Sequence, residues 1–280
     1  HSFPTRRSSD LALTRFDEVE DLETREEIEQ LTSGFESKEE YFLSTLSRGI
    51  SSIAVSQYPE PVVVRMSDFK TNEYADLIGG EFFEPEEENP MLGFRGASRY
   101  YSDRYRDGFA LECRAIRRAR EEIGLDNIII MIPFCRSLDE ADRVLEVLEE
   151  NGLKRGEKGL EIYMMCEIPA NLLLAPQFAR RFDGFSIGTN DLTQLVLGVD
   201  RDSEELSDLF DERNEAVKMA VADVIEKAHE AGIKVGLCGQ APSDHPDYAA
   251  FLVESGIDSI SVSHDSVVAV LQTVAEAESS

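Results

Sequence analysis

The 280-residue sequence predicts an α/β barrel, in which parallel strands alternate with helices around a ring. Short, nearly continuous apolar segments alternate along the chain with segments whose apolar residues recur at helical spacing. Strands that are apolar on both faces are typical of a parallel sheet covered by helices. Polar, charged or glycine residues follow nearly every apolar segment, and a barrel carries its functional site at that end of its strands.

Six apolar segments are predicted strands, and a seventh is weaker. The weaker segment, Met91–Arg95, ends in polar residues and glycine. Seven strands are one fewer than a closed (β/α)8 barrel needs, and an open doubly wound sheet is the alternative. The six segments are VVVRM after Pro61, IIIMIPF from Ile128, EIYMMCE, FDGFSIG, IKVGLCG and DSISVS.

Serine residues ahead of apolar periodic segments predict where helices begin. Ser37 with Glu40, and Ser137 with Glu140, have the spacing of a capping box. In this arrangement the side chains of both residues satisfy backbone N–H groups that the first turn leaves without partners. Ser102 is the expected cap of a further helix before the second predicted strand.

Four stretches are expected along the chain. Residues 1–11 (HSFPTRRSSDL) differ in composition from the acidic sequence that follows and are interpreted as an artefact or a foreign segment. Residues 12–58 form an acidic, helical N-terminal region, residues 59–275 form the barrel, and residues 276–280 form a tail.

The composition excludes several classes of protein. The 56 Asp and Glu residues against 28 Lys and Arg give a net charge of -28, so nucleic acid is not an expected partner. Lys is scarce among the basic residues, which suggests adaptation to high salt. The sequence has no Trp and no long uncharged apolar run, so no membrane span is expected. Four irregularly spaced cysteines favour a reducing cytoplasm over a zinc site or a disulfide framework.

Two acidic residues follow neighbouring predicted strands. Glu167 comes after the apolar MMC, and Asp191 comes shortly after FSI. Two carboxylates at the ends of adjacent strands can hold one Mg²⁺, which keeps positions for water and substrate oxygens. A helix cap or a salt bridge is the alternative for either acid taken singly. In the turn GTND, Gly188 permits close backbone approach, and Thr189 and Asn190 offer hydrogen-bonding groups, although Asn190 or Asp191 could equally be an N-cap.

Arg65 and Arg95 stand where predicted strands end. A guanidinium suits bidentate contact with carboxylate or phosphoryl oxygens, and an anionic substrate needs local positive charge in so acidic a protein. Both arginines are equally compatible with pairing to a carboxylate of the barrel.

Cys238 ends an apolar strand between two glycines, which leaves its thiol little shielding. A cysteine in a strand is more often a small buried hydrophobic residue, and packing is the expected role of Cys113, Cys135 and Cys166.

Five ordered motifs resemble the phosphoenolpyruvate-utilising enzymes over the range from about Pro59 to Asp265. The forms SDFKTNEY and CGQAPSDHP are more similar to phosphoenolpyruvate synthases than to other branches of that family. Family barrels begin with a strand that carries an L-x-R-x-E-like motif, so this barrel is expected to lack its first strand through N-terminal truncation. The motifs are VVVRMSDFKTNEY, ENPMLGFRGASRYY, MMCEIPAN, FSIGTNDLTQLVLGVDRD and VGLCGQAPSDHPD.

The resemblance implies a role for each candidate residue. Glu167 and Asp191 become ligands of Mg²⁺, for which Mn²⁺ can substitute. Cys238 becomes the general acid or base at the methyl carbon of pyruvate, a task that suits a thiol whose ordinary pKa is about 8.5. The implied substrate-binding residues are Arg65, Arg95, Glu167, Gly188, Thr189, Asn190, Asp191 and Arg201.

The resemblance also implies partners. Pyruvate and phosphoenolpyruvate are the expected ligands, and a homodimer is compatible with the family. No histidine of the chain lies in a Gly/Thr-rich carrier motif, and no G-x-x-x-x-G-K-[ST] loop is present. The phosphohistidine carrier and the ATP-binding domain are therefore expected elsewhere in a cytoplasmic enzyme of gluconeogenesis.

Other functions remain open on the sequence. The barrel of a pyruvate phosphate dikinase or of a phosphoenolpyruvate-dependent sugar phosphotransferase would share these motifs. A Mg²⁺-dependent lyase that acts on carbon–carbon bonds through a pyruvate enolate would need the two acids and an arginine, but neither Cys238 nor a second arginine. An inactive remnant is the third alternative.

Overall fold

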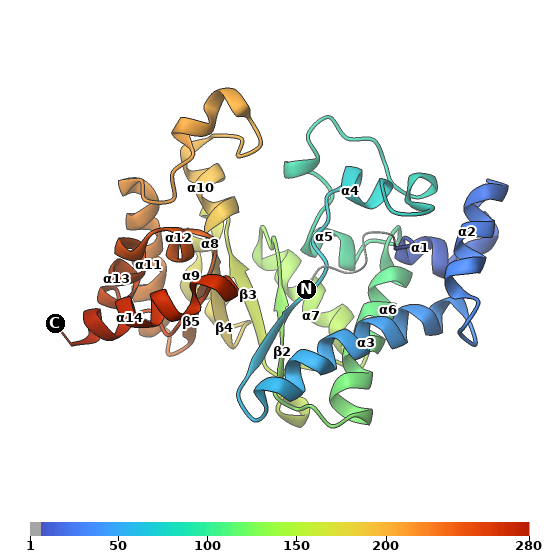
Figure 1. The fold of residues 1–280 in the computed structure, drawn as a ribbon, viewed down its shortest axis with the longest axis horizontal. Coiled ribbons are helices and arrows are strands. Elements are labelled where there is room, and N and C mark those ends of the chain that lie inside the picture. Colours follow the sequence, from blue (N-terminus) through green and yellow to red (C-terminus); the bar gives the residue numbers. More distant parts are fainter. Residues whose placement is uncertain (1–6, 280) are drawn as a thin grey trace. The chain divides into compact units, whose positions relative to one another are not determined.

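The computed structural model describes residues 7–279, which fold as two compact units (Figure 1). The first unit consists of His1–Ile130 and Asp142–Leu160, and the second consists of Met131–Ala141 and Glu161–Ser280. The first unit carries Arg65 and Arg95, and the second unit carries the other predicted site residues.

The order of the strands in the sheet follows the chain, β1-β2-β3-β4-β5-β6. A doubly wound sheet reverses its strand order at a switch point, whereas a barrel adds each new strand on the same side. The predicted α/β barrel class is therefore confirmed, and the doubly wound alternative is wrong. The strands are β1 (Val62–Arg65), β2 (Ile128–Ile132), β3 (Ile162–Cys166), β4 (Gly184–Gly188), β5 (Lys234–Cys238) and β6 (Ser259–Ser261).

The weaker seventh strand, predicted at Met91–Arg95, is wrong. A short 3-10 helix, η3 (Pro90–Leu92), occupies this place. Pro90 has a fixed φ and no N–H to donate, which suits the first turn of a helix better than a strand. The backbone N–H of Phe94 donates to the side chain of Glu87 at 3.0 Å. The described residues thus contain six strands of the eight in a complete barrel.

Helices make up most of the first unit. Helix α3 packs against α6, and both pack against α1 (Figure 1). The helices are α1 (Asp10–Thr14), α2 (Leu22–Thr32), α3 (Lys38–Gln57), α4 (Thr71–Ala75), α5 (Ala97–Tyr100), α6 (Arg106–Arg117) and α7 (Leu138–Glu150), which also reaches into the second unit, with the short turns η1 (Phe16–Glu18), η2 (Gly80–Phe82), η4 (Arg118–Glu122) and η5 (Glu157–Gly159).

An apolar cluster holds the N-terminal helices of the first unit together. Removing these side chains from water stabilises the packing by roughly 25 cal/mol per Å² of apolar surface. Arg7–Leu11, part of the segment interpreted as foreign, are buried, and residues 1–6 lie outside the described residues. The origin of residues 1–11 stays a prediction. The cluster consists of Ala12, Leu13, Val19, Ile28, Phe42, Leu43, Leu111 and Ala115.

The predicted helix starts agree only in part with the structure. The Ser37 hydroxyl accepts a hydrogen bond from the Glu40 N–H at 3.0 Å, as expected, but the Glu40 carboxylate pairs with Arg118 at 2.7 Å. Ser137 accepts from the N–H of Glu140 at 3.1 Å, which confirms the serine half of the second capping box, and the Glu140 carboxylate accepts from the N–H of Arg136 at 2.7 Å.

The expected cap by Ser102 is wrong. Helix α6 has Tyr105 as its N-cap residue, and the Ser102 hydroxyl accepts from the N–H of Arg104 at 3.3 Å. The chain therefore makes a separate turn after Ser102 before α6 begins.

The second unit contains the parallel pairs β3–β4, β4–β5 and β5–β6. All residues of β3 and β4 are buried, which explains their continuous apolar sequences. Helix α11 packs against β4 and β5. The remaining elements are α8 (Pro169–Leu173), α9 (Ala175–Ala179), α10 (Thr189–Leu197), η6 (Glu204–Leu209), α11 (Glu215–Glu230), α12 (Ala241–Asp244), α13 (Pro246–Glu254), η7 (His264–Ser266) and α14 (Val267–Glu278).

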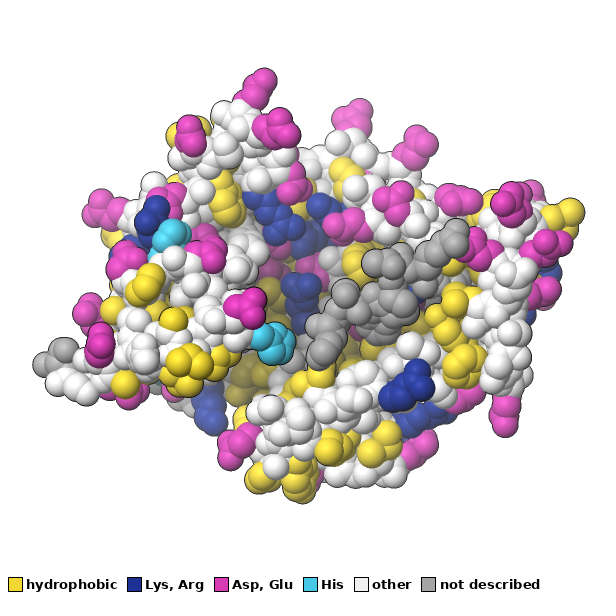
Figure 2. All heavy atoms as spheres, viewed as in Figure 1, with side chains coloured by type: hydrophobic (Ala, Val, Ile, Leu, Met, Phe, Trp, Pro, Cys, Tyr) yellow, Lys and Arg dark blue, Asp and Glu magenta, His cyan; other side chains and the backbone are white. Residues whose placement is uncertain are grey.

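Acidic side chains are spread over the face of the protein shown in Figure 2, as the net charge of -28 requires. Among the described residues, no helix combines the length and the apolar character that crossing a bilayer demands. Helix α14 continues to Glu278, so residues 276–278 of the predicted tail are helical.

Candidate active site

The carboxyl ends of three adjacent strands bring most of the predicted residues of the second unit together. In the strand register, Ile187 of β4 pairs with Cys166 of β3, and Gly188 pairs with Cys238 of β5. Glu167 follows β3 directly. Because parallel strands end at the same edge of a sheet, Glu167, Gly188 and Cys238 share that edge.

Glu167 and Asp191 are both buried, with exposed fractions of 1% and 6%. Their carboxylates approach one another, with ligand oxygens within 4.8 Å. Glu167 Oε1 accepts a hydrogen bond from the Phe134 N–H at 2.7 Å, which fixes one side of its carboxylate. Two buried carboxylates at this spacing are hard oxygen donors that fit Mg²⁺ or Mn²⁺.

An asparagine that the sequence analysis missed fixes the backbone of Glu167. Asn171 is fully buried in α8. Its Oδ1 accepts from the N–H groups of Ile168 and Glu167 at 3.0 and 3.3 Å, and its Nδ2 donates to the Cys135 carbonyl at 2.7 Å. An asparagine in the first turn of a helix that starts with proline was the available signal, since such side chains commonly satisfy N-terminal N–H groups.

Gly188 leaves room for the Glu167 side chain. A Cβ atom at this position would lie 2.6 Å from Glu167 Oε2 and 2.8 Å from Met165 Cε. Both distances are far below van der Waals contact. Any other residue at 188 would therefore displace the carboxylate.

The turn after β4 begins helix α10 with Gly188 as its N-cap, so the alternative that Asn190 or Asp191 caps the helix is wrong. Thr189 is buried, and its hydroxyl donates to Glu212 Oε1. Asn190 is exposed. Burial raises the pKa of Glu212, and the hydrogen bond from Thr189 partly opposes that rise.

Arg201 lies close to Asp191. Its Nη1 is 3.7 Å from Asp191 Oδ1, and the backbone N–H of Arg201 donates to Gln194 Oε1 at 3.1 Å. A charged arginine thus lies next to one of the two buried carboxylates, a proximity that was not predicted from the sequence.

Cys238 differs from the other three cysteines in its surroundings. Its side chain is partly accessible, whereas Cys113, Cys135 and Cys166 are buried. Burial raises the pKa of the Cys113 and Cys166 thiols, which keeps them protonated and unreactive. The Ser186 hydroxyl, on β4, donates to Cys238 Sγ at 3.2 Å. Ser186 was missed, although a serine inside an otherwise apolar strand is a visible signal.

The predicted arginines of the first unit have different environments. Arg65 is the exposed last residue of β1. Arg95 is 4% exposed and makes two hydrogen bonds to Asp68, from Nε at 3.1 Å and from Nη2 at 2.6 Å. The alternative in which an arginine pairs with a carboxylate therefore applies to Arg95. Asp68, in the SDFKTNEY motif, was not singled out from the sequence.

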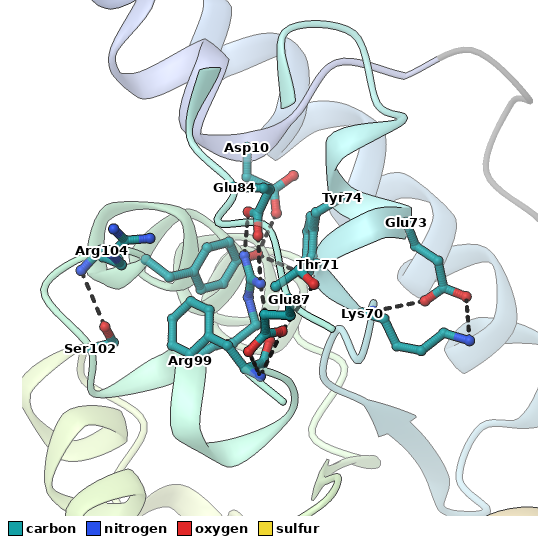
Figure 3. Close-up of polar contacts among 12 residues, drawn as sticks. Asp10, Lys70, Thr71, Glu73, Tyr74, Glu84, Glu87, Arg99, Ser102 and Arg104 are labelled. Atoms are coloured by element: carbon teal, nitrogen blue, oxygen red, sulfur yellow. Dashed lines mark hydrogen bonds and ion pairs between the residues drawn. The ribbon is translucent and has the colours of Figure 1, made fainter. Parts of the chain in front are cut away.

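A second buried arginine lies close by. Arg99 Nη1 donates to Glu84 Oε2 at 2.9 Å, and its guanidinium lies over the rings of Tyr74, Phe94 and Tyr105 (Figure 3). Cation–π and ionic contacts together satisfy a charge that would otherwise be costly to bury. The ion pair between Arg99 and Glu84 links the segment before η3 to helix α5.

Curated proteins resemble the chain over most of its length. It is 60% identical to a phosphoenolpyruvate synthase of Aquifex aeolicus, over 90% of this chain and 30% of that protein. It is 56% identical to the phosphoenolpyruvate synthases of Synechocystis and Escherichia coli, over 96% and 95% of this chain and 33% of each relative. The chain thus spans about a third of the length of these relatives.

A family model described as "PEP-utilising enzyme, PEP-binding domain" matches residues 16–279. This range includes all six strands and every candidate site residue. The chain therefore belongs to the PEP-utilising enzymes and carries their PEP-binding domain.

Proposed function

We propose that this chain is the part of a phosphoenolpyruvate synthase in which pyruvate receives a phosphoryl group from phosphohistidine. In the intact enzyme, ATP, pyruvate and water would give AMP, phosphoenolpyruvate and phosphate. The observation that carries the proposal is the shared strand edge of Glu167, Gly188 and Cys238 in the second unit. The similarity to phosphoenolpyruvate synthases supports the particular reaction.

Glu167 and Asp191 would hold Mg²⁺ or Mn²⁺, since their buried oxygens lie within 4.8 Å of one another. The bound ion would stabilise negative charge on the oxygen of the pyruvate enolate. Gly188 would admit the substrate close to the backbone, and Thr189 and Asn190 would provide hydrogen-bonding groups beside it.

Cys238 would move the proton. In the direction of synthesis, its thiolate removes a proton from the methyl carbon of pyruvate, and the electron pair of the broken C–H bond forms the enolate. The Ser186 hydroxyl, which donates to Cys238 Sγ at 3.2 Å, would stabilise the negative sulfur before the proton arrives.

The enolate oxygen then attacks phosphorus, and the phosphorus–nitrogen bond to the carrier histidine breaks with its electrons left on the imidazole. Arg65, Arg95 and Arg201 would bind the carboxylate of the substrate and the transferring phosphoryl group. Positioned positive charge matters particularly here because the chain as a whole carries a net charge of -28.

The phosphohistidine carrier and the nucleotide-binding domain would be the partners of this barrel. The chain by itself is expected to bind pyruvate and phosphoenolpyruvate weakly and to form no phosphoenolpyruvate from ATP and pyruvate. The similarity to proteins about three times as long supports the presence of these domains elsewhere in the intact enzyme.

Calorimetric titration of the chain with phosphoenolpyruvate in the presence of Mg²⁺ tests the proposal. Binding should depend on the metal and should be weaker for lactate and for inorganic phosphate, which each carry only part of the substrate. Equal heats for all three compounds, or none for phosphoenolpyruvate, would contradict the proposed function.

A further inference from the structure

Hydrogen bonds to glutamate side chains hold the backbone next to both members of the Arg95–Asp68 ion pair in the first unit. The residue before Asp68 is Ser67, and the residue before Arg95 is Phe94. The backbone N–H of each of these preceding residues donates to a glutamate carboxylate that comes from elsewhere in the chain. Two carboxylates therefore fix the backbone on both sides of one ion pair.

Glu112, on helix α6, supports the Asp68 side. Its Oε1 accepts from the Ser67 N–H at 2.9 Å and from the Ser67 hydroxyl at 3.1 Å. The carbonyl of Ser67 accepts a hydrogen bond from the Tyr100 hydroxyl at 2.7 Å. Both backbone polar groups of Ser67 are thus bound, which leaves the adjacent Asp68 little freedom.

Burying Glu112 is energetically expensive. The residue is 5% exposed, and burial together with the nearby charge of Asp10 raises its pKa to about 7, although Arg7 and Ser67 act in the opposite direction. An apolar residue of similar size would fill the same space without this cost. The carboxylate is therefore better explained by the contacts it makes with Ser67 than by stability.

Glu87 supports the Arg95 side. Its two carboxylate oxygens accept from the Phe94 N–H at 3.0 and 3.1 Å, and Oε2 accepts from the Thr71 hydroxyl at 3.0 Å. Figure 3 shows Glu87 and Thr71 together beside Arg99. A Cβ atom at Gly93 would collide with the Glu87 carboxylate. In the run of acids PEEEN, Glu87 is half-buried, whereas its two flanking glutamates are exposed.

We propose that Glu112 and Glu87 are positioning residues that set the orientation of Arg95 for an anionic substrate, by fixing Ser67 and Phe94. This inference rests on the proposed function, in which Arg95 binds the substrate or its phosphoryl group. Arginine has a long side chain, and its guanidinium directs hydrogen bonds only in its own plane. Misplacing such a group by about 1 Å can cost up to about 100-fold in the step that it serves.

Two pairs of substitutions test this role. Glu112→Leu and Glu87→Ala remove the acceptor, whereas Glu112→Gln and Glu87→Gln keep an amide oxygen in its place. Phosphoenolpyruvate affinity, measured by calorimetry with Mg²⁺, should weaken by about 10- to 100-fold in the first pair. The glutamine variants should recover most of the affinity, because a carbonyl oxygen also accepts from a backbone N–H.

A second readout does not depend on substrate. The Nε–H of Arg95 donates to Asp68, so its resonance in ¹⁵N-arginine-labelled protein should show slow exchange with solvent. Glu112→Leu and Glu87→Ala should shift this resonance and accelerate its exchange. Asp10→Asn is the matched control, because Asp10 lies near Glu112 and accepts from the Tyr105 hydroxyl but, among the described residues, makes no hydrogen bond with Ser67.

The outcomes separate the two proposals. Wild-type values of both phosphoenolpyruvate affinity and Arg95 Nε–H exchange in Glu112→Leu and Glu87→Ala would overturn the positioning role. A wild-type chain that binds no phosphoenolpyruvate would instead contradict the proposed function, while the exchange measurement still decides whether these glutamates orient Arg95. Should Glu112→Leu fail to fold, Tyr100→Phe tests the same side, since it removes the other hydrogen bond to Ser67.

Discussion

The hydroxyl of Ser186 on β4 donates a hydrogen bond to the sulfur of Cys238 on β5, over a distance of 3.2 Å. The two residues are not direct partners in the register, since Gly188 pairs with Cys238 and Ser186 pairs with Gly236. The contact is therefore diagonal across two neighbouring strands, a distance that side chains on one face of a sheet can span. Cys238 is also partly accessible, whereas Cys113, Cys135 and Cys166 are buried.

Cys238→Ala in a full-length synthase that contains this chain should abolish phosphoenolpyruvate formation and leave phosphorylation of the carrier histidine by ATP intact. General acid–base catalysis contributes roughly 10²–10⁴-fold, so exchange of the pyruvate methyl protons with deuterated water should fall by that factor. Ser186→Ala should slow the exchange less, by about 10-fold, because it removes one hydrogen bond to the sulfur.

Cys113→Ala is the matched control, because Cys113 is buried on helix α6 in the first unit. It should leave the rate of proton exchange unchanged. Exchange at the wild-type rate in Cys238→Ala would show that Cys238 only packs and that another group carries the proton.

Metal affinity should depend on the two buried carboxylates of the second unit. Glu167→Gln and Asp191→Asn should each weaken Mn²⁺ binding by at least about 10-fold, because each replaces a charged oxygen ligand by a neutral one. Isothermal calorimetry measures the change directly. Glu226→Gln, an exposed change on α11, should leave the affinity as it is. Unchanged affinity in both site variants would remove the metal from this position.

Gly188→Ala should act on the same site through geometry alone. The added Cβ would lie 2.6 Å from Glu167 Oε2, so the carboxylate must move away. We expect Mn²⁺ affinity to fall nearly as far as in Glu167→Gln. Gly34→Ala is the control, since nothing lies within 4 Å of its added Cβ. Equal Mn²⁺ affinities for the two alanine variants and the wild type would mean that Glu167 does not need its observed position.

The free energy of unfolding should depend on pH through the titration of Glu112. Its pKa is about 7 in the folded protein against an ordinary value of 4.5, so the folded state binds more protons than the unfolded state between these pH values. The free energy of unfolding should therefore decrease as pH rises from about 4.5 to 7, by roughly 3 kcal/mol from this group, and stay level above.

Glu112→Gln removes this titration. The free energy of unfolding of the variant should therefore increase relative to that of the wild type as pH rises from about 4.5 to 7. Urea unfolding of both proteins at several pH values between 4.5 and 8 measures the difference. Stability curves that run parallel for the two proteins would contradict the assignment of this pH dependence to Glu112.

Local patterns in the sequence were sufficient for the strands and for much of the second unit's site. All six apolar segments are strands, and in β2, β3 and β4 every residue is buried, which leaves a direct mark on sequence. Met91–Arg95 has no such continuous pattern, and there Pro90 and the contact between Glu87 and Phe94 produce a 3-10 turn. The strand-end residues Glu167, Gly188 and Cys238 were found because parallel strands place their carboxyl ends at one edge.

The supporting residues were harder to find in this way. Asn171 and Ser186 carry a local signal that does not indicate their partners, and Glu112 differs little in local sequence from other acidic residues of helices. Their importance comes from the atoms they meet, which belong to distant parts of the chain, as in the 45-residue separation between Ser67 and Glu112. Among 56 acidic residues, nothing in the sequence indicates which few are buried.

The sequence by itself determined the barrel class, the family and the strand-end residues, since each depends on short-range patterns of apolar, glycine and charged residues. Only the tertiary structure decided that Arg95 pairs with Asp68, that Ser186 donates to Cys238, and that Glu112 and Glu87 fix the backbone beside the arginine. The physical reason is that hydrogen bonds and ion pairs act over a few ångströms in space. Which groups come within that distance depends on how the whole chain packs.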